Sequence, residues 1–137
     1  MAEMKEVIRV ESNGTLNFGD YTLESKAKVN NFDVNGDIFK VKTYKDITKL
    51  ECNEVFVYES VPGTTVNHYT RTENEVSFIV KGYDGAQITL GLEPETAYEI
   101  FVGGESVGVM NTNLGGKLSL SVEIAGTDGI SILVNKK

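Results

Sequence analysis

The sequence contains no tryptophan, one cysteine and one histidine in 137 residues. A single cysteine, Cys52, excludes a disulfide within the chain, and no histidine lies near it in sequence. We interpret it as a buried, unreactive thiol rather than a reactive or metal-bound one. The usual zinc sites take three or four ligands, and Cys52 and His68 supply at most two. We therefore predict no zinc site and no cofactor.

Long apolar runs are also missing. No segment approaches the roughly 20 apolar residues that a membrane-spanning helix needs, so we predict no membrane insertion. The first six residues, Met-Ala-Glu-Met-Lys-Glu, are charged, and no apolar signal-peptide segment follows them. We expect a cytoplasmic protein from the chain as it stands. A location on the cell surface or outside the cell would require unconventional export or removal of a signal.

Positive charge is scarce, because 13 basic residues face 20 acidic ones and the net charge is −7. Binding to nucleic acid draws its affinity largely from Lys and Arg, so we predict no nucleic-acid partner. One basic run interleaved with aromatics, residues 39–45 followed by Lys49, is compatible with single-strand binding. We favour a different interpretation, in which these lysines mark an edge strand and discourage edge-to-edge pairing.

The sequence is instead rich in alternating apolar and polar residues, a period of two that indicates β-strands. Asn13-Gly14, Asn35-Gly36 and Gly103-Gly104 separate such runs, and we expect type I′ hairpins at the two Asn-Gly pairs and a third tight hairpin at Gly103-Gly104. The only segment in which we expect a helical turn is 46–53, with Asp46 as its cap. The predicted strands span residues 6–12, 15–18, 28–34, 37–43, 54–61, 65–70, 75–81, 86–92, 98–102, 106–110, 117–124 and 129–135.

These signals predict an all-β fold, an antiparallel β-sandwich with Greek-key or meander hairpins. We expect a layer of hairpins over residues 1–52 packed on a sandwich over residues 53–137, the two forming one compact unit. The segment Leu92-Glu-Pro94-Glu-Thr-Ala-Tyr98 resembles a tyrosine corner, in which a hydroxyl bonds upstream backbone near the start of a strand. Pro94 and Tyr98 are therefore predicted to be structural residues.

From about residue 75 to residue 134 the chain resembles the fibronectin type III and immunoglobulin-like accessory domains of secreted bacterial proteins. The corner, the hairpin Phe101-Val-Gly-Gly-Glu-Ser-Val-Gly108 and the segment 112–122 carry this resemblance. It implies a non-catalytic accessory role and a sandwich fold for the C-terminal half. The whole chain is similar to small all-β proteins labelled endosialidase, but the arginine triad of sialidases cannot be built from two arginines, Arg9 and Arg71.

Two sets of residues are candidates for ligand binding. Asp33, Asn35 and Asp37 have the alternating spacing of a calcium loop, although an Asn-Gly hairpin explains the same residues. The second set consists of four tyrosines, whose planar rings are suited to stack on sugar rings, and one nearby asparagine, whose amide is suited to bond the sugar. These ligand candidates are Tyr44, Tyr58, Asn67, Tyr69 and Tyr83. The alternative for the tyrosines is packing at the boundary of the core.

No nucleophile elbow, phosphate loop or catalytic triad is present in the sequence, and we predict no enzymatic activity. The favoured hypothesis is a structural or protein-interaction module, such as a surface, appendage or tail-like subunit that forms homo-oligomers through its sheet edges. The alternative is a carbohydrate-binding accessory module with a polysaccharide partner. A small glycan-active hydrolase would need two converging carboxylates, which sequence alone does not reveal.

Overall fold

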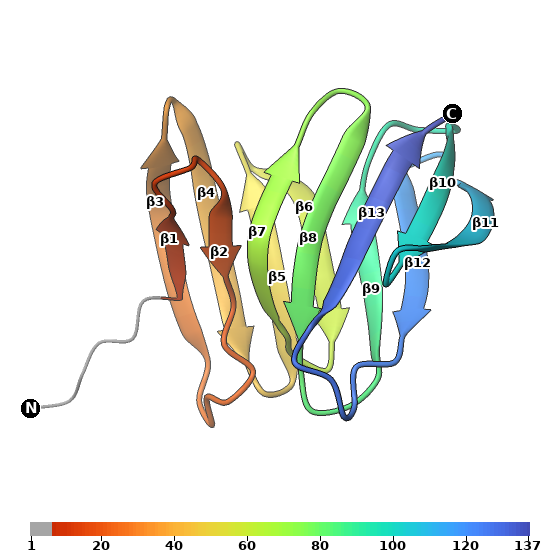
Figure 1. Cartoon of the computed structure of the whole chain (residues 1–137). Coiled ribbons are helices and arrows are strands. Elements are labelled where there is room, and N and C mark those ends of the chain that lie inside the picture. The colour runs from red at the N-terminus through yellow and green to blue at the C-terminus, as the bar shows by residue number, and fades with distance from the viewer. Residues whose placement is uncertain (1–6) are drawn as a thin grey trace, which may run out of the picture.

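The computed structural model describes residues 7–137, and its regular structure is entirely β-strand (Figure 1). In this described part of the chain thirteen strands form two antiparallel sheets, so the predicted all-β sandwich is confirmed. Within these residues no helix is long and apolar enough to cross a membrane. Glu6, the first residue of the predicted strand 6–12, lies outside the described residues.

The two sheets lie face to face, with β1 and β2 in front of β3 and β4 in the view of Figure 1. The seven-stranded sheet consists, in spatial order, of β1 (Ile8–Val10), β2 (Leu16–Phe18), β7 (Thr65–Arg71), β8 (Glu75–Lys81), β13 (Ile130–Lys136), β10 (Ala97–Val102) and β11 (Glu105–Asn111). The six-stranded sheet consists of β12 (Lys117–Val122), β9 (Ala86–Gly91), β6 (Val55–Val61), β5 (Ile47–Cys52), β4 (Asp37–Tyr44) and β3 (Ala27–Val34).

All three predicted hairpins form, but their turns differ. Asn35 and Gly36 both have positive φ, 52° and 95°, as a type I′ turn requires, and so do Gly103 and Gly104. At Asn13-Gly14 only the glycine has positive φ, and Glu11 and Thr15 close a wider loop through their backbone hydrogen bond. The prediction of a type I′ turn is therefore wrong at this one position.

The prediction of a helical turn over 46–53 is wrong, because these residues form strand β5. Thr48 and Leu50 are fully buried two residues apart, which is the period of a strand. The spacing of Ile47 and Leu50, three residues apart, suggested a helical face. The buried Thr48 side chain distinguishes the strand from a helical turn, because its hydroxyl bonds the Thr43 hydroxyl and the Thr64 carbonyl.

The expected boundary between residues 1–52 and 53–137 falls inside the β5–β6 hairpin. Cys52 pairs with Val55 there, across a tight turn at Asn53 and Glu54. In the other sheet β2 pairs with β7. Both sheets therefore contain strands from both sides of this boundary.

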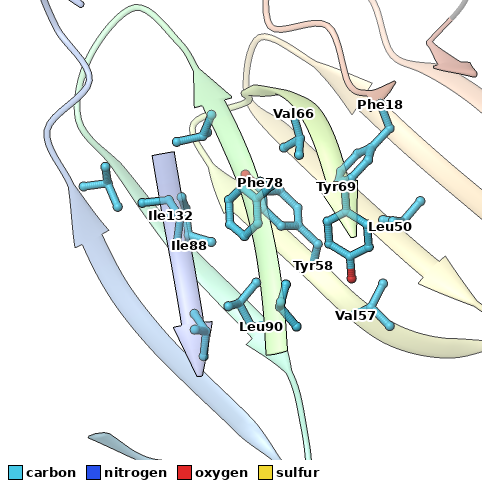
Figure 2. Close-up of a cluster of buried hydrophobic side chains, with 14 of the residues drawn as sticks. Phe18, Leu50, Val57, Tyr58, Val66, Tyr69, Phe78, Ile88, Leu90 and Ile132 are labelled. Carbon is cyan, nitrogen blue, oxygen red and sulfur yellow. The ribbon is translucent and has the colours of Figure 1, made fainter. Parts of the chain in front are cut away.

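A cluster of aromatic rings occupies the centre of the core between the sheets (Figure 2). Phe18 contacts Tyr58 and Tyr69 edge to face, with ring centroids 5.1 and 5.5 Å apart. Phe78 meets Tyr58 in the same way at 5.6 Å. Edge-to-face contacts of this kind stabilise a core beyond the area that the rings bury.

A network of buried hydroxyls lies beside these rings. Thr64 Oγ1 shares hydrogen bonds of 2.7 Å with both the Tyr58 hydroxyl and Ser60 Oγ. Thr48 Oγ1 donates to the Thr64 carbonyl at 2.8 Å and shares a hydrogen bond with Thr43 Oγ1. Burial raises the pKa of Tyr58, while its hydrogen bond to Thr64 acts in the opposite direction. Each of these hydroxyls therefore has a partner inside the core.

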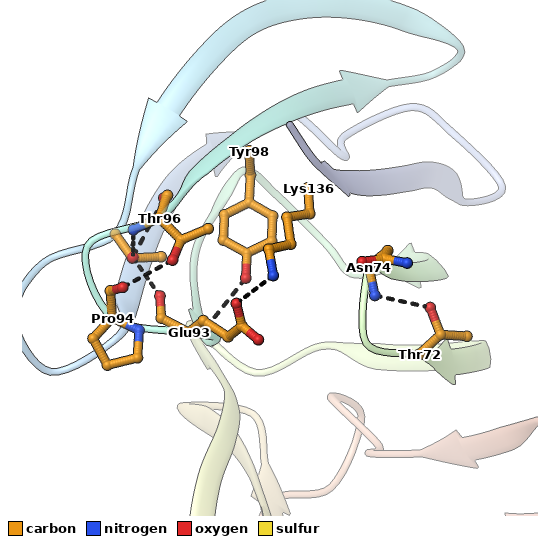
Figure 3. A network of polar contacts seen from close by, with 8 residues as sticks. Thr72, Asn74, Glu93, Pro94, Thr96, Tyr98 and Lys136 are labelled. Atoms are coloured by element: carbon orange, nitrogen blue, oxygen red, sulfur yellow. Dashed lines mark hydrogen bonds and ion pairs between the residues drawn. The ribbon is translucent and has the colours of Figure 1, made fainter.

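The tyrosine corner forms as the sequence predicts (Figure 3). Tyr98, the second residue of β10, is 3% exposed, and its hydroxyl accepts a hydrogen bond from the Glu93 backbone N–H at 3.3 Å. The Glu93 side chain forms an ion pair with Lys136 at 2.7 Å. The hydroxyl thus ties the β9–β10 connection to the sheet at the start of β10.

A second side chain, that of Thr112 directly after β11, also bonds the β9–β10 connection. Its hydroxyl donates to the Glu93 carbonyl and accepts from the Thr96 N–H at 2.9 Å. Thr96 in turn donates through its own hydroxyl to the Pro94 carbonyl at 2.8 Å. Pro94 therefore belongs to a loop in which side chains, that of Tyr98 in β10 among them, bond the backbone polar groups.

We expect Tyr98→Phe to lower the free energy of unfolding by about 1 kcal/mol, because it removes one neutral hydrogen bond and keeps the buried ring. Chemical denaturation monitored by circular dichroism measures this change. Tyr83→Phe is the control, since Tyr83 is 69% exposed, and we expect no change for it. An unaltered stability of Tyr98→Phe would mean that the corner does not hold the connection.

Candidate functional site

The calcium candidates lie in the β3–β4 hairpin, where their oxygen atoms bond neighbouring protein groups. Asp33 Oδ1 accepts from the Gly36 N–H at 3.0 Å, and Asp37 Oδ1 accepts from Asn53 Nδ2 at 3.1 Å. Asn35 supplies the positive φ of the turn. Within the described part of the chain no three His, Cys, Asp or Glu side chains form a group suited to a metal ion. The observed contacts of Asp33, Asn35 and Asp37 are those of a hairpin.

Two of the ligand candidates, Tyr58 and Tyr69, lie in the core. Their side chains are 0% and 5% exposed, and Phe18 and Phe78 contact both rings. A sugar ring at the surface cannot stack on either of them. The sequence does not reveal this, because Tyr at an inward position looks the same as Tyr at an outward one.

The remaining candidates occupy separate elements. Tyr83 is 69% exposed in the β8–β9 loop and packs edge to face on Tyr21, with ring centroids 4.7 Å apart. Tyr44 is half-buried at the end of β4, where Lys26 Nζ lies 5.8 Å from its ring centroid. Asn67 is half-buried in β7 and pairs with Ile79. The exposed Tyr83 and the half-buried Tyr21 thus form an aromatic pair at the surface, and the sequence did not single out Tyr21.

The basic run lies in β4, which has β3 and β5 as neighbours. The prediction that it forms an edge strand is therefore wrong. Lys40 and Lys42 alternate with the inward-facing Val41 and project from the outer face of the sheet. On the same face Lys49 of β5 forms an ion pair with Glu51 at 3.7 Å. This face thus carries both signs of charge.

Cys52 is half-buried at the end of β5, and burial raises the pKa of its thiol, with a further contribution from the Asp37 carboxylate. A raised pKa favours the thiol over the reactive thiolate. His68 lies in β7 at a bulge with φ of 56°, and its backbone N–H donates to Asn17 Oδ1 at 2.9 Å. The contacts of His68 are thus those of a bulged strand.

The edge strand β11 differs from every other strand, because all seven of its residues are exposed. It pairs with β10 alone, and it forms the outer end of the seven-stranded sheet (Figure 1). Val107 and Val109 are 60% and 53% exposed, Met110 is 37% exposed, and Leu114 just beyond the strand is 79% exposed. Apolar residues therefore surround an edge whose outer N–H and C=O groups have no strand partner within residues 7–137.

The other three edges carry the features that discourage pairing. β1 has only three residues. β3 exposes Lys28 and Asp33 and contains a bulge around Asn31, which has positive φ. β12 turns its leucines inward and exposes Lys117 and serines. Short strands, charges and bulges all limit edge-to-edge contact. β11 is thus the edge best suited to pair with another strand.

A scan against protein-family models finds no match to this chain. Searches of curated proteins and of solved structures likewise find no similar protein.

Proposed function

We propose that this protein is a non-catalytic interaction module that associates with a second copy of itself through β11. The observation that carries this proposal is the exposure of all seven residues of β11, with three apolar side chains among them. A second β11 would extend the sheet and bond the outer N–H and C=O groups. It would also remove the valine side chains from water, which favours association.

Self-pairing is compatible with the sequence of β11. In an antiparallel pair centred on Gly108, Val107 of one copy faces Val109 of the other, and this contact occurs twice. Glu105, the only charged residue of the strand, then faces Asn111 rather than a second carboxylate. Pairs of β-branched residues stabilise adjacent strands, whereas like charges directly opposite each other destabilise them. Such a two-fold contact uses the same surface on both copies.

The position of β11 supports this arrangement sterically. β11 pairs with β10 on one side only, and it ends the sheet at the side away from β1. Like β3, β11 contains a bulge, at Val107, but it has seven residues, and Val107 and Val109 remain 60% and 53% exposed. A partner strand can therefore approach β11 without displacing another element.

Sedimentation equilibrium from micromolar to millimolar protein tests the proposal. We expect the weight-average mass to rise from 15.0 kDa toward twice that value as the concentration increases. Closed two-fold pairing predicts that the mass stops at the dimer. A mass that stays at the monomer value across the whole range would refute the proposal.

Carbohydrate binding is a second candidate, and the exposed ring of Tyr83, which packs on the half-buried Tyr21, is the observation that favours it. An exposed tyrosine offers an apolar ring face beside a polar hydroxyl, which suits a sugar. Affinity electrophoresis in gels containing polysaccharides measures such binding. We expect retardation of the wild-type protein and its loss in Tyr83→Ala. If no polysaccharide retards the wild type, this second candidate fails.

A further inference from the structure

A groove of about 380 Å³ opens between the two sheets, on the side of the sandwich away from β11. Its walls come from the β1–β2, β3–β4 and β5–β6 hairpins and from β7. Leu16, Phe39 and Val57 supply apolar surface, while Asp37, Tyr69 and Arg71 supply polar groups. The volume lies in the range of small-molecule pockets, which combine apolar walls with a few polar groups.

The Tyr69 hydroxyl is the unusual group in this groove. It is buried and has no hydrogen-bond partner among the described residues. In Figure 2 it points away from Phe18 and toward Val57, which also lines the groove. A buried polar group without a partner is costly in a folded protein. A ligand atom in the groove would supply the missing partner.

The Tyr69 hydroxyl is suited to donate a hydrogen bond to an acceptor atom of a ligand. Burial raises the pKa of Tyr69, and the positive charge of Arg71 acts in the opposite direction. At neutral pH the group is therefore a neutral phenol, whose O–H is available to donate a hydrogen bond. The Arg71 guanidinium lines the same groove and acts on this pKa through its charge and through a side-chain contact with the hydroxyl, but that contact lacks the geometry of a full hydrogen bond.

Arg71 adds a positive charge that its neighbours do not neutralise by contact. Its Nη1 donates to the Gly91 carbonyl at 2.8 Å, which fixes the guanidinium at the end of β7. Within residues 7–137 it forms no ion pair with a carboxylate. A guanidinium has five N–H donors, so donors remain for a second acceptor.

We infer that the groove binds a small molecule with an apolar body and one carboxylate, which accepts hydrogen bonds from the Tyr69 hydroxyl and the Arg71 guanidinium. The apolar body lies against Leu16, Phe39 and Val57. Charged hydrogen bonds of this kind are stronger than neutral ones, and Arg is suited to carboxylates in particular. The hydroxyl is buried, so a ligand atom reaches it only when a side chain of the groove wall shifts.

The site is tested with two probes of the same shape, 3-phenylpropionate and its neutral amide, 3-phenylpropanamide. Binding is followed by the methyl NMR shifts of Leu16 and Val57 and by isothermal titration calorimetry. We expect saturable shifts with the carboxylate and binding at least about tenfold weaker with the amide. Absence of saturable shifts with the carboxylate would overturn the inference, and so would equal binding of the two probes.

Two substitutions localise the binding. We expect Tyr69→Phe and Arg71→Gln each to weaken 3-phenylpropionate binding at least about tenfold. Arg9→Gln is the matched control, because Arg9 is the other arginine of the chain and forms an ion pair with Glu11; it should leave binding unchanged. Thermal melting confirms that each variant is folded. Wild-type affinity in folded Tyr69→Phe would overturn the inference.

Discussion

Val109→Lys is expected to raise the dissociation constant of the self-association by about 100-fold or more and to leave a monomer at micromolar concentration. In the pairing proposed here, Val109 faces Val107 of the partner at both contacts. A lysine at this position would bring an ammonium group into an apolar contact, and a 100-fold change corresponds to about 2.7 kcal/mol. Lysines on edge strands prevent pairing in many sheets for the same reason.

The matched control is Val61→Lys, because Val61 has the same 53% exposure as Val109 but lies at the end of β6 in the other sheet. Its mass distribution should equal that of the wild type. Circular dichroism should show both variants folded, since each replaces an exposed side chain. If Val109→Lys dimerises like the wild type, or if Val61→Lys disrupts the dimer equally, the contact does not lie at β11.

Thr64→Val is expected to lower the free energy of unfolding by about 3 kcal/mol, the largest stability effect that we predict. The two side chains have nearly the same shape, so no cavity forms. The substitution removes the shared partner of the Tyr58 and Ser60 hydroxyls, both of which are 0% exposed. Each buried hydroxyl left unsatisfied costs about 1–3 kcal/mol.

Thr89→Val provides the comparison for this prediction. Thr89 lies in β9 and shares a hydrogen bond with Ser119 at 2.9 Å, but this bond is exposed and water can replace it. We expect its stability to change by less than about 0.5 kcal/mol. Urea denaturation of the two variants gives both values. Equal stabilities would show that the buried hydroxyls find other partners after Thr64 loses its oxygen.

The strands could be predicted from the sequence because their signals are local. The alternation in 117–124 predicted an inward face, and Leu118, Leu120, Val122 and Ile124 are buried as expected. The tyrosine corner was likewise predicted from a short segment, since the Tyr98 hydroxyl bonds backbone only five residues upstream. Strand β5 was missed because Ile47 and Leu50 suit a helical turn as well as a strand, and only tertiary contacts of Thr48 distinguish the two.

The candidate sites depend on strand order, which no local pattern contains. The segment 106–110 was predicted to be a strand, but its place at the edge follows from the pairing of β10 with both β11 and β13. The groove forms because β7 lies opposite the β3–β4 and β5–β6 hairpins, which brings Tyr69 and Arg71 near Asp37. Asp37 lies more than 30 positions from both Tyr69 and Arg71 in the sequence.

Backbone amide hydrogen exchange of β11, compared between dilute and concentrated protein, tests the proposed association most directly. Self-pairing predicts that alternate amides of residues 105–111 exchange more slowly as the protein concentration rises, because a partner strand then bonds them. The amides of β12, one of the two edges of the other sheet, should exchange at the same rates under both conditions. Exchange of β11 that does not depend on concentration would contradict the account, as would protection that appears at β12 instead.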